Sequence, residues 1–145
     1  MKRADTIRSL DTLVRLRSSE VDRLQADVAR QEATRARYQA NLDKLSALAE
    51  GSGASGALSP ALALNCGHYK QNVMAMADAH RVDLHLHVAN MAVSQRSLAA
   101  AWTKRELLGK VLGQQQAAAS REHERAARKR EDDVATQSWL AGRAA

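Results

Sequence analysis

The feature that most constrains the fold is a seven-residue repeat of apolar side chains in the first third of the chain. From Ile7 onward these positions advance by alternating steps of three and four residues, the spacing of a helix that supercoils around another helix. Polar residues interrupt the repeat at Arg17, Gln31 and Arg35. We therefore predict a long helix over about residues 4–50 that packs along one seam. Its apolar seam positions are Ile7, Leu10, Val14, Val21, Leu24, Val28, Tyr38, Leu42, Leu45 and Ala49.

A run rich in glycine and serine ends this pattern and predicts a turn. Three glycines between residues 51 and 56 lower helix propensity, so we expect a loop over about residues 51–59. Ser59 is suited to cap a new helix and Pro60 to occupy its first position, where the missing N–H costs nothing. A second helix over about residues 60–138 should run antiparallel to the first, because the loop is short.

Composition favours a thin seam over a thick core. The hydrophobic fraction of 45% is carried largely by alanine, aromatic residues make up 3% of the chain, and phenylalanine is absent. Alanine offers little area to bury, and it is a strong helix former. We therefore predict an all-α fold in a single domain, residues 1–145: a long antiparallel two-helix coiled-coil hairpin with an overhanging C-terminal helical arm.

The predicted seam of the second helix is less regular than that of the first. Two successive four-residue steps, from Met76 through His80 to Leu84, predict a stutter that locally unwinds the supercoil. The large or seam-spaced residues assigned to this face are Leu62, Cys66, Tyr69, Val73, Met76, His80, Leu84, His87, Met91, Leu98, Trp102 and Leu112.

The predicted loop also predicts which residues face each other. If the two helix ends are level at the loop, the numbers of facing residues sum to about 109, because both helices rise equally per residue. Gln31 should then lie opposite residues near 78, and Tyr38 opposite residues near 71. The chain after about residue 108 should overhang as a polar arm that frays unless a partner orders it.

Residues that could carry chemistry favour plain structural roles. His80, Asp83 and His87 fall on one helix face, but a structural zinc site wants four ligands, so we expect no metal. Cys66 is the only cysteine and is expected to act as a small buried hydrophobe in the seam. No phosphate-binding loop or nucleophile–base constellation can be assembled, so we expect no cofactor, no catalytic residue and no enzyme.

The net charge of +6 is spread along the chain, with its clearest concentration near the C-terminus. Arg121, Arg125 and Arg128 form one stripe, which acidic neighbours dilute. A protein-docking arm and a solvated face are both open readings, while nucleic-acid binding is less favoured because base-reading residues are missing. No signal sequence and no membrane-spanning run are visible, so we expect a cytoplasmic protein that meets a membrane only through partners.

The predicted pairing gathers a cluster of seam residues from both helices. Two of the four aromatic side chains, Tyr38 and Tyr69, belong to it. They could pack across the seam with their hydroxyls in water, or they could form part of a contact surface. The cluster consists of Gln31, Tyr38, Leu42, Tyr69, Val73, Met76 and His80.

Several short motifs, in their order and spacing, resemble the flagellar FliJ family, the small coiled-coil component of the bacterial flagellar type III export apparatus. The motifs span most of the chain. They are Leu10-Asp11-Thr12-Leu13-Val14-Arg15-Leu16-Arg17, Arg37-Tyr38-Gln39, Asn65-Cys66-Gly67-His68-Tyr69, Ala79-His80, Trp102 with Leu107 to Leu112, and Lys129-Arg130-Glu131-Asp132-Asp133-Val134-Ala135.

The resemblance implies a stalk-like protein at the cytoplasmic face of the inner membrane. Its implied partners are the hexameric export ATPase with its regulator, the export-gate membrane protein and export chaperones, which it would escort. Carried over residue by residue, the export-gate contact falls on the seven-residue cluster defined above. The ATPase ring would be addressed by the C-terminal arm, through Arg121, Arg125, Arg128, Asp132 and Asp133.

The chain departs from the family pattern at a few positions. Cys66 and Tyr69 stand where aromatic residues are frequent, Arg35 replaces an apolar residue, and Met76 is larger than the usual alanine. Two alternatives stay open from the sequence. One is the equivalent stalk protein of a virulence-associated type III secretion system, and the other is a structural or nucleic-acid-binding coiled coil.

Overall fold

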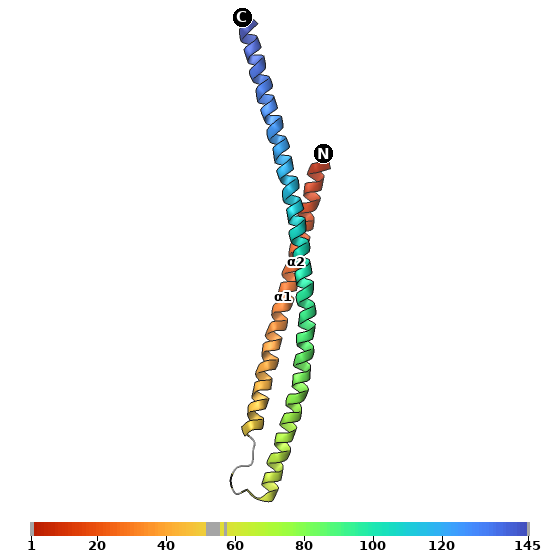
Figure 1. Ribbon diagram of the computed structural model, residues 1–145, viewed down its shortest axis with the longest axis vertical. Helices are drawn as coiled ribbons and strands as arrows, with labels where there is room; N and C mark the ends of the chain where they lie inside the picture. The colour runs from red at the N-terminus through yellow and green to blue at the C-terminus, as the bar shows by residue number, and fades with distance from the viewer. Residues whose placement is uncertain (1, 52–55, 57, 145) are drawn as a thin grey trace. The chain divides into compact units, whose positions relative to one another are not determined.

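The computed structural model describes residues 2–51, 56 and 58–144. Helix α1 is Lys2–Gly51 and helix α2 is Pro60–Ala144, and this part of the chain contains no strand (Figure 1). The predicted all-α fold of two long helices packed against each other is confirmed. Both helices extend slightly further than predicted, while most of the predicted loop, residues 52–55 and 57, lies outside the described residues.

The start of α2 shows the predicted cap. The Ser59 hydroxyl oxygen accepts a hydrogen bond from the backbone N–H of Leu62 at 3.4 Å, and the Ser59 carbonyl accepts from the N–H of Ala63 at 2.9 Å. Pro60 is the first helical residue, where no N–H is needed. Just before it, Gly56 has a φ of +83°, a left-handed conformation that glycine adopts without strain.

The heptad of α1 is confirmed along its whole length. Every predicted seam position is buried or half-buried, and Val21 is fully buried. Arg17, Gln31 and Arg35 are half-buried too, so these polar residues stay in the seam and do not shift its phase. The a positions therefore run from Ile7 through Leu42 to Ala49.

The predicted stutter in α2 is wrong. Between Val73 and Leu84 the covered residues keep alternating steps of four and three, because the seam passes through Ala77, which is 3% exposed, and not through Met76, which is 60% exposed. Further along α2 an alanine again takes the seam position in place of its larger neighbour: Ala101 is buried, and Trp102 is 49% exposed. The large side chains point away because small neighbours occupy the heptad positions.

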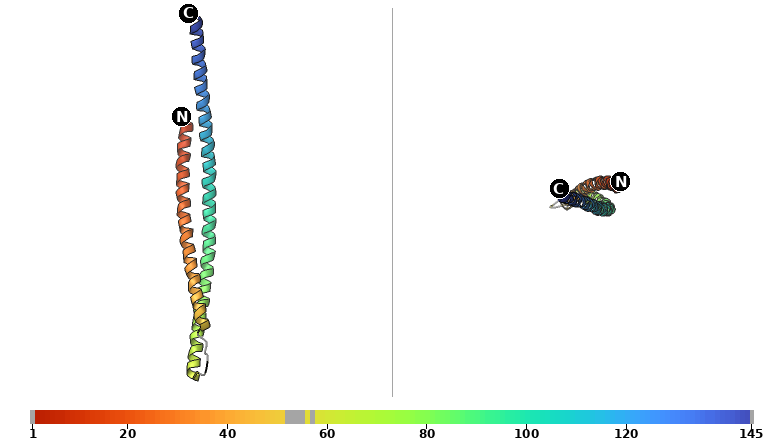
Figure 2. Two further views of the ribbon diagram at one scale, coloured as in Figure 1. Left: turned by 90° about the vertical axis from the view of Figure 1, so that its left-hand side faces the viewer. Right: turned by 90° about the horizontal axis from the view of Figure 1, so that it is seen from above.

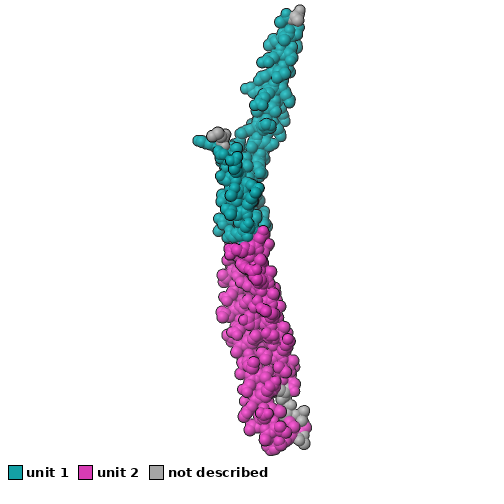
Figure 3. Space-filling model, turned by 180° about the vertical axis from the view of Figure 1, so that it is seen from behind, with its two compact units in different colours: residues 1–21, 101–145 teal, residues 22–100 magenta. Residues whose placement is uncertain are grey.

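The chain divides into two compact units, shown in different colours in Figure 3: Met1–Val21 with Ala101–Ala145, and Asp22–Ala100. In each unit the segments of α1 and α2 lie side by side and antiparallel (Figures 1 and 2). The expectation of a single domain stays a prediction.

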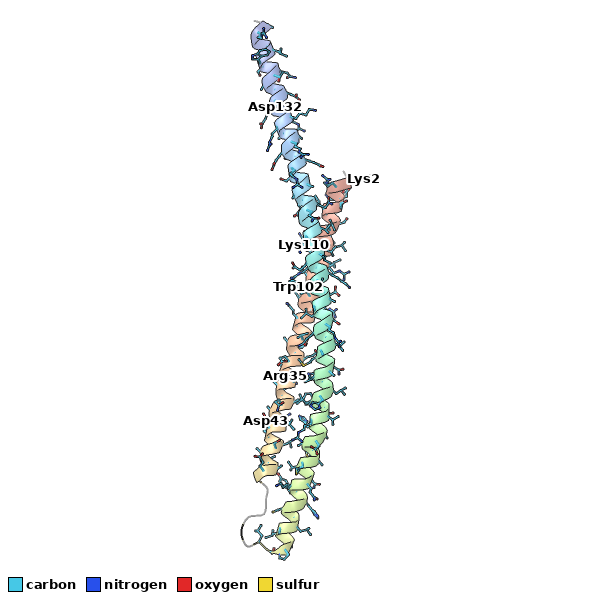
Figure 4. All side chains as sticks on the ribbon, viewed as in Figure 1. Lys2, Arg35, Asp43, Trp102, Lys110 and Asp132 are labelled. Atoms are coloured by element: carbon cyan, nitrogen blue, oxygen red, sulfur yellow. The ribbon has the colours of Figure 1, made fainter. Side chains whose placement is uncertain are left out.

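In the first unit, Arg3 forms an ion pair with Glu122. Leu112 and Ala101 are buried in the seam of this unit. Beyond Glu122 nearly every residue of α2 is exposed, and Asp132 lies well past Lys2, the first described residue of α1 (Figure 4). The predicted overhanging arm is therefore present, but it begins near residue 122 and not near residue 108.

In the second unit, the predicted pairing is wrong by about three to four turns of helix. Gln31 faces Ser94 and His87, not residues near 78. The prediction assumed that the helix ends are level at the loop. Instead the last turn of α1 lies against residues 70–81 of α2, so the first turns of α2 extend past the end of α1. The residue of α2 that faces a given residue of α1 therefore lies further along the sequence than predicted, by the length of that extension.

Candidate partner-binding site

A polar layer crosses the seam of the second unit. The side-chain amide of Gln31 donates a hydrogen bond to the hydroxyl of Ser94 at 3.0 Å. His87 Nε2 lies 2.8 Å from the backbone carbonyl oxygen of Gln31. Because a carbonyl can only accept, this nitrogen of His87 carries a proton. A polar residue on each helix is thus tied to the other helix by a specific contact.

Tyr38 of α1 lies between two imidazole rings of α2. Its ring centroid is 5.0 Å from that of His80 and 5.6 Å from that of His87, at interplanar angles of 56° and 49°. These tilted contacts are favourable for aromatic rings. We call Gln31, Tyr38, His80, His87 and Ser94 the polar layer.

Two atoms of the polar layer are buried without a hydrogen-bond partner among the described residues. They are the amide oxygen of Gln31 and Nε2 of His80. A buried polar atom that loses its contact with water and gains no partner costs about 1–3 kcal/mol. The layer is therefore a weak place in the seam, next to the apolar cluster of Leu42, Ala77 and Leu84.

The two edges of the helix pair differ in character. Tyr38, a d position of α1, contacts His80 and His87, whereas Leu42, an a position, belongs to the cluster with Ala77 and Leu84. In an antiparallel pair the d positions of both helices share one edge, and the a positions share the other. The polar layer therefore occupies the d edge.

Exposed apolar side chains flank the same edge. Tyr69 and Met76 are 48% and 60% exposed, and Leu48 of α1 is 50% exposed. All three stand one position before an a position, which is the g position that adjoins the d edge in the heptad. The pairing of Gln31 with Ser94 and of Tyr38 with His80 puts Leu48 across the seam from residues 69–76. We call the polar layer together with Leu48, Tyr69, Val73 and Met76 the contact edge.

The seven residues of the cluster predicted from the sequence thus differ in burial, but most of them lie on the same side of the helix pair. Gln31, Tyr38, Val73 and His80 lie in the seam at the d edge, and Tyr69 and Met76 lie outside it on the same side. Leu42 is buried at the opposite edge. Tyr38 packs against histidines and Tyr69 is exposed, so these two rings do not stack across the seam as one reading supposed.

Three residues of the contact edge are missing from the predicted cluster. His87 belongs to the predicted seam of α2 but not to the cluster, because the predicted pairing has the wrong offset. Ser94 and Leu48 belong to neither prediction. A regular heptad through Ala77 puts Ser94 at a d position of α2, and the heptad of α1, with Ala49 at an a position, puts Leu48 beside the seam.

A charged pair borders the polar layer on α1. Arg35 Nε donates to both carboxylate oxygens of Glu32, at 3.0 and 3.1 Å, and Arg35 is labelled in Figure 4. This hydrogen bond lowers the pKa of the Glu32 carboxyl; desolvation opposes the shift, and the potentials of Arg35 and His87 add to it. The same bond raises the pKa of Arg35. Arg35 thus occupies a seam position while its charge is satisfied within its own helix.

The predicted metal-like grouping is split by the fold. His80 and His87 contact Tyr38 from either side, whereas Asp83 is exposed. Within the described residues, no three or more histidine, cysteine, aspartate or glutamate side chains gather as a metal site would require. Cys66 is half-buried at a seam position, as predicted.

The residues expected to address the ATPase ring lie on the overhanging arm of the first unit. Arg121, Arg125, Arg128, Asp132 and Asp133 are all exposed. Arg128 lies 3.9 Å from Glu124, one turn earlier on the same helix. The arm presents both signs of charge to solvent, with α1 absent beside it.

Comparison with known protein families gives a match over nearly the whole chain. A family model described as "Flagellar FliJ protein" matches residues 6–144. No curated protein and no solved structure matches the chain. In the described part of the chain, neither helix holds a stretch apolar and long enough to cross a membrane.

Proposed function

The chain belongs to the FliJ family, and we propose that it binds the export-gate membrane protein through the contact edge. Membership implies a component of the flagellar type III export apparatus, and we infer that the chain has no catalytic activity of its own. It supports flagellar export more than the two alternatives that the sequence leaves open, a virulence-associated secretion system and a structural or nucleic-acid-binding coiled coil.

One observation carries the proposal. All the residues to which the resemblance assigns gate contact, except Leu42, lie along a single edge of the second unit, although the pairing that first grouped them was wrong. Exposed apolar residues beside polar ones are typical of protein-binding surfaces, which are enriched in tyrosine and methionine. Tyr69 and Met76 offer the accessible part of this surface.

The experiment measures binding of the full-length chain to the cytoplasmic part of the export-gate protein by titration calorimetry. Tyr69→Ala and Met76→Ala should each weaken binding about tenfold or more, as central interface residues do. Neither should change helicity, because both side chains lie outside the seam. Val82→Ala is the matched control, since Val82 is 66% exposed on another face of α2. Equal binding by all four proteins would rule out this edge.

The overhanging arm is the proposed site for the hexameric export ATPase. Its exposed charges, among them Arg121, Arg125 and Arg128, can form ion pairs with a ring surface that a helix enters. Added to the ATPase, the full chain should raise ATP turnover and ring formation. The triple change of these arginines to glutamate should abolish the effect, and an unchanged stimulation would exclude the arm.

Three further roles complete the proposal and rest on the family alone. They are contact with the regulator of the ATPase, escort of export chaperones, and a cytoplasmic location in which the chain reaches the inner membrane only through its partners. Co-fractionation with membranes that contain the export gate, and its loss from membranes that lack it, would test the location. Chaperone escort is tested by mixing the chain with a purified export chaperone and following complex formation.

A further inference from the structure

The polar layer holds hydrogen-bonding groups that a partner cannot reach while the helices stay together. The amide oxygen of Gln31 and Nε2 of His80 are buried and have no partner among the described residues. Both belong to residues of the proposed gate contact. Side chains that recognise a partner by hydrogen bonds must meet it directly or through water, so the closed seam hides part of the surface.

The closed seam is also poorly held at this place. Each helix contributes polar residues at d positions, where leucine normally packs. Gln31 uses its amide N–H for Ser94 and its backbone carbonyl for His87, but its amide oxygen is left over. Tyr38 also packs against the apolar cluster of Leu42, Ala77 and Leu84, but each unsatisfied buried atom raises the free energy of the closed seam and so lowers the cost of opening it.

We propose that the polar layer is a binding site that opens: a segment of the gate protein parts α1 and α2 at the d edge and hydrogen-bonds Gln31 and His80. This inference rests on the proposed gate-binding function and deepens it. The inserted segment carries a side-chain donor, an amide, guanidinium or ammonium group, because the unsatisfied oxygen of Gln31 can only accept. Tyr69 and Met76 hold the segment from outside the seam.

The position of the apolar cluster gives a direct readout of opening. Ala77 is 3% exposed and lies one turn from His80, in the same cluster as Leu42 and Leu84. A cysteine placed there, in a Cys66→Ser background, should react slowly with a maleimide. On addition of the cytoplasmic part of the export gate, the reaction of Ala77→Cys should speed up about tenfold, whereas a surface-bound partner would leave it unchanged or slow it.

A reversible clamp gives the complementary test. Leu45 packs against the cluster that contains Ala77, so the pair Leu45→Cys and Ala77→Cys can be joined across the seam by a thiol-cleavable bismaleimide. Clamped, the chain should bind the gate fragment about tenfold more weakly than the same protein after cleavage of the linker. Comparing one variant with itself removes any effect of the substitutions.

The control clamp joins the helices in the first unit. Arg3 and Glu122 face each other there, and Arg3→Cys with Glu122→Cys, joined by the same reagent, should not change gate binding. Equal affinity of the clamped and cleaved Leu45–Ala77 protein, with no acceleration at Ala77→Cys, would overturn the opening and leave surface binding standing. Failure of the unmodified chain to bind the gate fragment at all would instead overturn the proposed function.

Discussion

Replacing His80 by leucine should stabilise the second unit. His80 lies at a d position, and its buried Nε2 has no partner among the described residues. Removing such an unsatisfied polar atom raises the free energy of unfolding by about 1–3 kcal/mol. The loss of the ring contact with Tyr38, whose centroid lies 5.0 Å away, costs about 0.5–1.5 kcal/mol. Leucine also fills a d position well. The expected net gain in the free energy of unfolding is about 1 kcal/mol.

The assay is urea unfolding of the full chain, followed by far-UV circular dichroism at neutral pH. The midpoint should rise for His80→Leu with no change in the slope of the transition. His85→Leu is the matched control, because His85 is exposed on the same helix, and surface substitutions usually stay within about 0.5 kcal/mol. A lower midpoint for His80→Leu than for the control would refute the reasoning, since it would mean that Nε2 is satisfied in the native protein.

Four other perturbations test the packing, the cap, the charged pair and the arm. Leu84→Ala should cost about 2–5 kcal/mol in urea unfolding, because Leu84 is buried in the apolar cluster, while exposed Leu86→Ala should change little. Ser59→Ala should cost about 0.5–2 kcal/mol through loss of the cap; unchanged stability would show that the cap is not formed. The pKa of Glu32 is lowered in the folded protein. Its ionised carboxylate therefore contributes to the free energy of unfolding above the unfolded-state pKa, and this contribution is lost as the pH falls through the folded-state pKa. Glu32→Gln should remove this loss of stability at low pH, which is measured from urea-unfolding midpoints at a series of pH values. The effect is small, because the pair lies at the surface. Deleting residues 123–144 should leave the unfolding midpoint nearly unchanged but abolish stimulation of the ATPase; a large loss of stability would show that the arm packs against the rest.

The seam of α1 was predictable because its heptad is carried by large branched side chains. Val21 and Leu42 are buried as expected, and the polar interruptions at Gln31 and Arg35 keep the phase. In α2 the same reasoning failed where alanine occupies the seam. Met76 is more hydrophobic than Ala77, yet the position on the helix decides which of them is buried. That position is found only when the alternating steps of three and four residues are continued without interruption.

The candidate site was predictable as a set of residues but not as an arrangement. The resemblance pointed to the cluster, and all its members except Leu42 share one edge. Their burial was not predictable. It depends on how far α2 extends past the end of α1, and a glycine-rich connection allows many such offsets.

The order of apolar and polar residues along the chain is enough to determine two long helices, the capped start of the second, and a polar arm at its end, because helix periodicity and capping are local properties. Which residue faces which was decided only by the tertiary structure. Tyr38 lies between His80 and His87, and Leu42 packs with Ala77 and Leu84, so the helices are held at one offset by the fit of side chains across the seam. That fit, and not the loop, hides Gln31 and His80 while leaving Tyr69 and Met76 exposed.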